Sequence, residues 1–413
     1  MDREFRDRGD LKIMGGKFSV NSLSGRLDRI RNGNQSKKAI PGNPVNSVRL
    51  SPPWKYVKPF VSVKKTVIKL SEIEKLKIEK LNSLFSCTIN HRLEDLLFYD
   101  LETTGLSGGA GTVAFLAGFG QIQDDDFLIT QLFLHDFPGE NDFLGQIKAL
   151  LTDEKIMVSY NGKSFDHPLL RTRFLMNGLK LPLIPEIDLL HTVRRLWKNR
   201  LPSCRLGIIE NEILNIHRKG DIPGIEIPDI YFNYLRKSRK MIDPEIYGVF
   251  NHHLQDIKSL AVLLAYIESL WNDPGSVSEK ERTSLGKLML HRGRKDGLEL
   301  LEKSWRSGDY EAGKIVSMSC KRNGNLKKAV YIWEEMWNGK PEIFQGIELA
   351  KYYEHKVKNI ENALDIVSIL LSGKSAGENQ RLQNLLVYRL ERLKRKKRLR
   401  SNILHIQKPF IDR

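Results

Sequence analysis

Four acidic residues, spread along the first two thirds of the chain, could together bind divalent cations. They are Asp100, Glu102, Asp166 and Asp256. Carboxylate oxygens are the ligands that Mg²⁺ and Mn²⁺ prefer. A pocket that gathers several of them can hold two such ions, an arrangement typical of sites that hydrolyse phosphodiester bonds. The residues around each acid indicate how its side chain would reach such a pocket.

Asp100 and Glu102 follow the apolar run Leu97-Phe98-Tyr99, which predicts a buried strand. Side chains two residues apart on a strand point to the same face. Both carboxylates can therefore reach one metal ion while Leu101 packs on the opposite face. A D-x-E pair alone is also common at solvated strand ends, so the pair gains meaning only together with the other acids.

Asp166 is predicted to lie in the first turn of a helix. Residues 155–160 are typical of a strand, the next two of a turn, and Ser164 of a helix N-cap. A carboxylate at this position could bind metal, or it could simply complement the helix dipole.

Asp256 is predicted to lie near the start of a long helix, because apolar residues recur with helical spacing between residues 251 and 270. His252 stands one helical turn before Asp256 on the same face, so a base and a metal ligand could point at one phosphate. His253, three residues before Asp256, can nearly do the same. Either histidine could instead be an ordinary exposed or hydrogen-bonded helix residue.

The order of these motifs resembles a known family. The chain carries FYDLETTGL, then VSYNGKSFDHPLL, then FNHHLQDIKSL. Over residues 96 to 270 this combination resembles the DEDD superfamily of 3′-5′ exonucleases, and within it the YprB-like exonucleases with a ribonuclease H-like fold. The resemblance implies two-metal hydrolysis of nucleic acid at a 3′ end, with two Mg²⁺ or Mn²⁺ ions bound by Asp100, Glu102, Asp166 and Asp256. It also implies that His252 is the general base, with His253 as the competing candidate.

Further residues are candidates for contacts with the nucleic acid. Those next to the acidic motifs are Thr103, Thr104, Gly105, Asn161 and Phe165. Beyond Asp188 a basic segment could contact phosphates, with Trp197 stacking on a base. Its basic residues include Arg194, Arg195, Lys198, Arg200, Arg205 and Arg218. The alternative is a charged helix face with Trp197 in the core.

The composition favours a polyanionic partner. The 413 residues carry a formal net charge of +17, which suits nucleic acid, either DNA or RNA, and we expect a single-stranded 3′ end. The N-terminal residues lack the apolar core of a secretory signal, and no apolar run approaches the length of a membrane span. We therefore expect a cytoplasmic protein without a membrane partner. A second class of function stays open, namely a non-catalytic nucleic-acid-binding or scaffold protein with the same fold.

We expect an α/β fold, a ribonuclease H-like mixed sheet flanked by helices, at residues 91–272. An antiparallel meander of three strands should begin it, with a helical crossover to the next strand. Residues 1–53 should be a basic, flexible segment. Residues 54–90 should be a connecting arm and helix, and the Val/Lys alternation in VSVKKTVIKL indicates that this arm is a strand or an extended segment. An all-α, tetratricopeptide-like domain is expected at residues 273–390, and a basic tail at residues 391–413.

The expected repeats rest on a spacing of 34 residues between two helical segments. It aligns Asn325 with Asn359 and Ala329 with Ala363, and it also aligns Ile332 with Ile366. A period of 34 with small residues at helix crossings resembles tetratricopeptide repeats. Such repeats would bind a protein or peptide partner, or would orient the substrate.

Overall fold

The computed structural model describes residues 50, 53–69, 78–85, 92–105, 109–124, 126–236, 244–373 and 379–407. The expected flexible segment at residues 1–53 lies almost wholly outside them. Within the described ranges, no helix is both long and apolar enough to cross a membrane.

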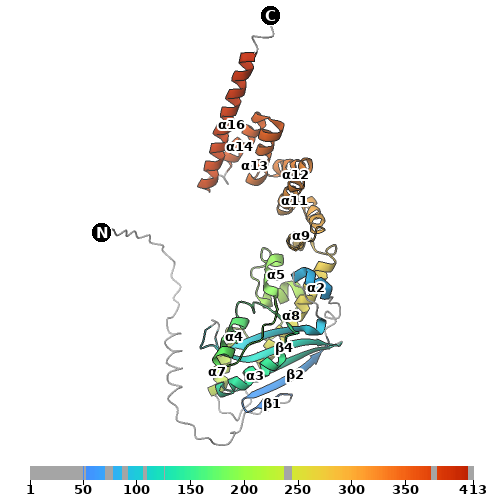
Figure 1. Cartoon of the computed structure of the whole chain (residues 1–413), viewed down its shortest axis with the longest axis vertical. Coiled ribbons are helices and arrows are strands. Elements are labelled where there is room, and N and C mark those ends of the chain that lie inside the picture. Colours follow the sequence, from blue (N-terminus) through green and yellow to red (C-terminus); the bar gives the residue numbers. More distant parts are fainter. Residues whose placement is uncertain are drawn as a thin grey trace, which may run out of the picture. The chain divides into compact units, whose positions relative to one another are not determined.

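A seven-stranded mixed sheet is the centre of the α/β region, with strand order β1-β2-β5-β4-β3-β6-β7 (Figure 1). The strands from β1 to β3 in this order pair antiparallel, whereas β3, β6 and β7 run parallel. The predicted meander and the crossover to β6 are thereby confirmed. The strands are β1 (Lys55–Lys58), β2 (Val61–Ile68), β3 (Leu96–Thr103), β4 (Ala114–Gln123), β5 (Asp126–Leu134), β6 (Ile156–Ser159) and β7 (Glu186–Asp188).

The first two strands come from the segment that was expected to be a connecting arm. β2 pairs with β5 along its whole length, from Val61↔Leu134 to Ile68↔Phe127. Without β2, the backbone N–H and C=O groups of β5 would form an open edge. The sheet therefore begins before residue 91, where the domain was expected to start.

Helices cover both faces of the sheet and complete its two cores. One core joins β3 to α3, α4, α7 and the start of α8, and the other joins β3 to α2, α5 and the rest of α8. The helices and turns of this region are α2 (Ile78–Phe85), η3 (Leu93–Asp95), η4 (Phe137–Gly139), α3 (Glu140–Leu150), α4 (Asp166–Met176), α5 (Leu189–Trp197), α6 (Leu206–Ile209), η5 (Glu210–Leu214), α7 (Ile227–Arg236) and α8 (Pro244–Asn272).

β3 lies between the two cores, and its side chains alternate between them as strand geometry requires. Tyr99 and Leu101 belong to the core with α3 and α4, whereas Leu96 and Phe98 belong to the core with α5 and the later part of α8. Asp100 and Glu102 continue the alternation of Leu96 and Phe98, so their side chains lie on the same face of the strand. The strand therefore presents both carboxylates on one face, as the sequence predicted.

α8 packs directly on β4 because two glycines of that strand leave room for it. A Cβ atom at Gly118 would lie 2.4 Å from Cε1 of His253, and one at Gly120 would lie 2.8 Å from Cγ2 of Ile257. Glycine within a strand often marks such a close approach. This contact fixes how far the helix stands from the sheet.

After α8 the described residues are mostly helical, as expected, and each helix contacts the next (Figure 1). The N-caps Asn325 and Asn359 have the same local structure, since each side chain accepts a hydrogen bond from the backbone three residues later. Ala329 and Ala363 are both fully buried. The 34-residue spacing thus relates two equivalent helix starts, while the tetratricopeptide assignment and its partner stay predictions. The helices are α9 (Glu279–His291), α10 (Gly297–Arg306), α11 (Tyr310–Arg322), α12 (Leu326–Gly339), α13 (Ile343–Tyr352), η6 (Tyr353–Val357), α14 (Ile360–Ser372) and α16 (Gln380–Gln407).

The expected boundary between repeats and basic tail falls inside α16. This helix runs without interruption from Gln380 to Gln407, because Leu386 and Leu393, on either side of residue 390, both belong to the core of the helical region. Most of the basic tail is therefore part of a packed helix, and residues 408–413 lie outside the described part of the chain.

Candidate active site

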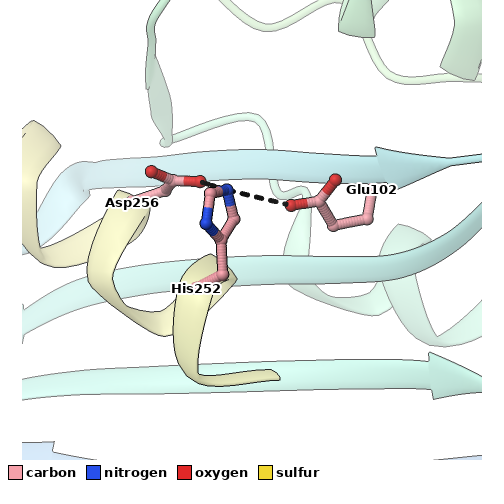
Figure 2. Close-up of side chains that lie close together, drawn as sticks. All are labelled: Glu102, His252 and Asp256. Carbon is pink, nitrogen blue, oxygen red and sulfur yellow. Dashed lines mark ion pairs between the residues drawn. The ribbon is translucent and has the colours of Figure 1, made fainter. Parts of the chain in front are cut away.

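Three of the predicted site residues meet where α8 crosses β3. Figure 2 shows Glu102 reaching from the strand toward His252 and Asp256 on the helix. His252 Nε2 lies 3.2 Å from Asp256 Oδ2 and 4.0 Å from Glu102 Oε1. One ligand atom from each of the three residues lies within 4.8 Å of the others, a spacing that one metal ion could bridge. The one-turn separation of His252 and Asp256 places both on the site face of α8.

Asp100 and Asp166 complete the acidic group. Burial, followed by the negative charges of Asp256 and Asp166, raises the pKa of Asp100 well above its usual value. Burial, followed by the negative charges of Asp256 and Asp166, also raises the pKa of Glu102 well above its usual value. Asp166 is buried, and burial together with Glu186 raises its pKa to about 8. The four predicted acids therefore interact electrostatically although they come from three separate elements.

The turn before Asp166 differs from the prediction. α4 begins at Asp166, as expected, but its N-cap is Phe165 and not Ser164. The backbone N–H of Ser164 donates to the carbonyl of Asn161, because Asn161 adopts a left-handed conformation with φ 67° and starts a tight turn. Ser164 therefore lies inside this turn, exposed and away from the start of the helix.

The chemistry of the acidic group suits a divalent cation. Among the described residues, no donor hydrogen-bonds to the carboxylate of Asp100 or Glu102, although these side chains are only 24% and 14% exposed. Partly buried carboxylates without donors repel one another and favour protonation. A metal ion bound between them would remove this penalty, and the donor set is entirely oxygen apart from His252.

His252 lies between carboxylates on both sides of its ring. Nδ1 is 2.7 Å from Asp221 Oδ1, and Nε2 faces Asp256 and Glu102. Burial opposes the charged form, but the hydrogen bonds and charges of Asp256 and Asp221 raise the pKa of His252 to about 9. Without a bound cation the ring is therefore protonated at neutral pH. Asp221, which the sequence did not single out, orients it.

His253 has a different environment although it is the next residue. It is fully buried, its Nε2 donates to the main-chain carbonyl of Asp100 (3.0 Å), and its Nδ1 accepts from Gln131 Nε2 (3.2 Å). Burial lowers its pKa to about 4, so it is neutral. With both ring nitrogens engaged, it has no lone pair left to accept a proton from water.

Arg218 neutralises part of the acidic group. Its guanidinium contacts Asp256 Oδ1 at 2.5 Å, Glu210 Oε1 at 2.6 Å and Asp221 Oδ2 at 3.1 Å. Arg218 was a candidate for phosphate contact, but these three ion pairs make it a support for Asp256 and Asp221. The segment HRKGDIPG, with Arg218 and Asp221 three residues apart, was the signal for this role.

The end of β3 and the loop after it hold three of the residues expected to contact nucleic acid. Thr103 Oγ1 donates to the carbonyl of Gly105, and Thr104 Oγ1 accepts from the N–H of Val113. Both threonine side chains thus fix the loop next to Glu102. Asn161 is exposed and Phe165 is half-buried in the turn before Asp166. Their contacts with nucleic acid stay predictions.

The base-stacking role expected for Trp197 is wrong. Trp197 is fully buried and its Nε1 donates to Glu281 at 2.8 Å, so no base can reach the ring. Arg200 contacts the same carboxylate at 2.9 Å. The alternative, a charged helix face with Trp197 in the core, describes α5 correctly. Arg195 is exposed on this helix.

Comparison with known proteins agrees with this geometry. The model of the ribonuclease H superfamily matches residues 97–268, which include all four acids and both histidines. The uncharacterized protein YprB of Bacillus subtilis is 34% identical over 316 residues, covering 73% of this chain and 75% of YprB. The chain belongs to the YprB family. Membership in the superfamily supports a nuclease-type hydrolase for this YprB-family protein, and the group formed by Glu102, His252 and Asp256 is a possible metal site.

Two solved structures have a region similar to this chain. One is the family B DNA polymerase of Pyrobaculum calidifontis, with a TM-score of 0.30 and 16% identity over 48% of this chain and 28% of the polymerase. The other is Escherichia coli exonuclease I in complex with a dT13 oligonucleotide, with a TM-score of 0.26 and 19% identity over 38% of this chain and 43% of the exonuclease. The chain thus spans less than half of either structure.

Proposed function

We propose that this YprB-family protein is a divalent-metal-dependent 3′-5′ exonuclease that hydrolyses phosphodiester bonds of DNA or RNA. The observation that carries the proposal is the convergence of Glu102, His252 and Asp256, with their ligand atoms within 4.8 Å of one another, beside Asp100 and Asp166. Each of these residues was a candidate on sequence grounds alone.

In this proposal Asp100, Glu102, Asp166 and Asp256 hold two Mg²⁺ or Mn²⁺ ions. Such ions, when bound, polarise a scissile phosphate and lower the pKa of an attacking water. The chain itself supplies the positions of the carboxylates: Asp100 and Glu102 on one face of β3, Asp166 at the start of α4 and Asp256 on α8.

His252 is the proposed general base. Asp221 holds Nδ1, so Nε2 points toward Glu102 and Asp256. The attraction of those two carboxylates keeps the ring protonated in the metal-free protein. Once their charge is neutralised, that attraction weakens, and the ring can accept the proton of a water molecule.

The test is cleavage of 5′-labelled single-stranded DNA and RNA oligonucleotides with Mg²⁺, Mn²⁺ or EDTA. We expect a ladder that shortens from the 3′ end, requires the metal and disappears in both Asp100→Asn and Asp256→Asn. The matched control is Asp229→Asn, which removes an exposed carboxylate on α7 and should leave the ladder unchanged. Comparing the two polymers decides the substrate.

Internal fragments without a 3′ ladder would instead indicate an endonuclease. No metal-dependent product from either polymer, or equal product from wild type and Asp100→Asn, would contradict the proposal and favour a non-catalytic binding protein. Thermal melting with Mn²⁺ separates these cases further, because a ligand that binds only the folded state raises the melting temperature.

A further inference from the structure

A cavity of about 620 Å³ lies at the carboxyl ends of β6 and β7. We call it the α5 pocket. Its lining includes Tyr160 and Asn161, which follow β6, and residues of α5 and of the loop after it. In sheets with parallel strands, ligands bind at the carboxyl ends of those strands.

The α5 pocket lies beside the candidate active site. β6 runs parallel to β3 with Phe98 paired to Val158, so Asp100 and Tyr160 both stand two residues beyond the same pair. Asn161 also begins the turn that ends at Asp166, and five residues span at most about 18 Å. A strand of nucleic acid that reaches the acidic group can therefore extend into this pocket.

The walls of the α5 pocket are held in place by hydrogen bonds. Tyr160 Oη donates to the carbonyl of Cys204 at 2.7 Å, which ties the end of β6 to the loop after α5. Asp188 Oδ1, at the end of β7, accepts from the N–H groups of Asn161 (2.8 Å) and Leu190 (3.0 Å). The pocket is thus formed before any ligand binds.

The mouth of the α5 pocket is cationic. Arg194, Lys198 and Arg205 line it and are exposed, and none of them pairs with an acidic residue within the described ranges. No acidic residue is among those lining the pocket. Arg194 on α5 and Lys198, the C-cap of this helix, are four residues apart, a spacing at which like charges repel. An anion in the pocket would offset this repulsion.

The floor of the α5 pocket is apolar. Leu190 and Leu201 line it and are buried. Cations at the mouth and leucines below match a nucleotide unit, which carries a charged phosphodiester on one side and a flat apolar base on the other. A pocket with cations alone would match only a phosphate.

We infer that the α5 pocket binds the phosphodiester backbone of a single nucleic-acid strand, with one base against Leu190 and Leu201. This inference rests on the proposed function, because it takes the substrate to be nucleic acid. It also assigns the phosphate contacts of α5 to Arg194 and not to Arg195, which does not line the pocket.

The test measures binding without cleavage. The full chain carries Asp100→Asn, EDTA is present, and fluorescence anisotropy follows a labelled single-stranded oligonucleotide at several salt concentrations. One variant combines Arg194→Gln, Lys198→Gln and Arg205→Gln. The matched control combines Lys148→Gln, Arg171→Gln and Lys180→Gln, which removes the same number of charges from exposed residues of the same α/β region that do not line the pocket. Thermal melting checks that both variants fold.

We expect the pocket variant to bind at least about tenfold more weakly at low salt, and the slope of log affinity against log salt to fall by about 2. The control should stay within about twofold of the parent. Equal losses in both variants would show diffuse attraction and overturn the inference. Competition by a mononucleotide as strong as by the oligonucleotide would also overturn it, because the pocket would then take a free nucleotide and not a strand.

Failure of the inference is distinguishable from failure of the proposed function. If wild type degrades the oligonucleotide with Mn²⁺ while both variants bind equally, the proposed exonuclease function stands and the inference about the α5 pocket fails. If wild type degrades nothing while the pocket variant alone binds weakly, the inference about the α5 pocket stands and the proposed exonuclease function fails.

Discussion

His253 Nε2 donates a hydrogen bond to the main-chain carbonyl of Asp100 across 3.0 Å. The bond joins α8 to β3 beside the carboxylate of Asp100. The neighbouring residue His252 faces the acidic group itself. Two adjacent histidines thus have separate tasks, one in the packing of the site and one in its proposed chemistry.

The first prediction separates the two histidines. His252→Ala should lower turnover about 100-fold or more, because it removes the proposed base. His253→Ala should lower the free energy of unfolding by about 3 kcal/mol, because it leaves a cavity and removes the hydrogen bonds of His253 to Gln131 and to the carbonyl of Asp100. Urea unfolding and steady-state cleavage measure the two effects. A larger loss of turnover in a well-folded His253→Ala would make His253 the base.

The second prediction concerns the free energy stored in the acidic group. Asp100→Asn should abolish cleavage, yet raise the free energy of unfolding in EDTA by about 1 kcal/mol, because it removes one of several repelling charges. Mn²⁺ should also stabilise the Asp100→Asn variant less than it stabilises wild type. Thermal melting with and without Mn²⁺ shows both changes, and an Asp100→Asn protein less stable than wild type in EDTA would contradict this account.

The third prediction concerns Arg218. Arg218→Gln removes the cationic partner of the almost fully buried Glu210 and leaves Asp256 with His252 alone. This change should cost about 3 kcal/mol of stability in EDTA. Mn²⁺ should recover part of the loss by restoring positive charge near Asp256. Unfolding by urea in the two conditions tests this. The exposed Arg171→Gln on α4 serves as the control and should change stability little.

The fourth prediction concerns the docking of α16. Glu354 of η6 is buried, and Arg392 (2.5 Å) and Lys396 (2.6 Å) of α16 contact its carboxylate. Burial opposes ionisation, but Lys396 and Arg392 lower the pKa of Glu354 below its usual 4.5. Glu354→Gln should reduce stability by about 2 kcal/mol at pH 7, since its partners are partly exposed.

The sign of the pH dependence follows from the lowered pKa. The contribution of Glu354 is fully present above pH 4.5 and is lost as pH falls through the lower pKa of the folded state. The difference in unfolding free energy between wild type and Glu354→Gln should therefore shrink below pH 4.5. A difference that grows toward acid pH would mean that Glu354 is held in its protonated form.

Local patterns were enough to predict most elements that position the site. The alternation in LLFYDLET sets the face of Asp100 and Glu102, and the helical period after Asn251 sets that of His252 and Asp256. Both depend on residues close in sequence. The resemblance to the exonuclease family then predicted that acids far apart along the chain, on β3, α4 and α8, share one site.

Other features depend on pairings between distant segments, which no local pattern reports. Asp256 meets Arg218 only because the loop before α7 returns to α8. The indole N–H of the buried Trp197 finds its acceptor on Glu281 of α9, more than eighty residues later. β2 could be recognised as a strand, but its partner β5 lies more than fifty residues later.

The core that α8 shares with Leu96 and Phe98 of β3 extends beyond the end of α8 at Asn272. It continues from Leu96 and Phe98 through Trp271 to Leu285 and Leu288 of α9 and Leu300 of α10. A gene fragment cut after Asn272 would encode a polypeptide whose apolar side chains on α5 and α8 face water, and it should aggregate during expression. The shortest fragment that retains every residue of this core ends after α10, near Arg306. An exchange of the sheet region between relatives should therefore include α9 and α10.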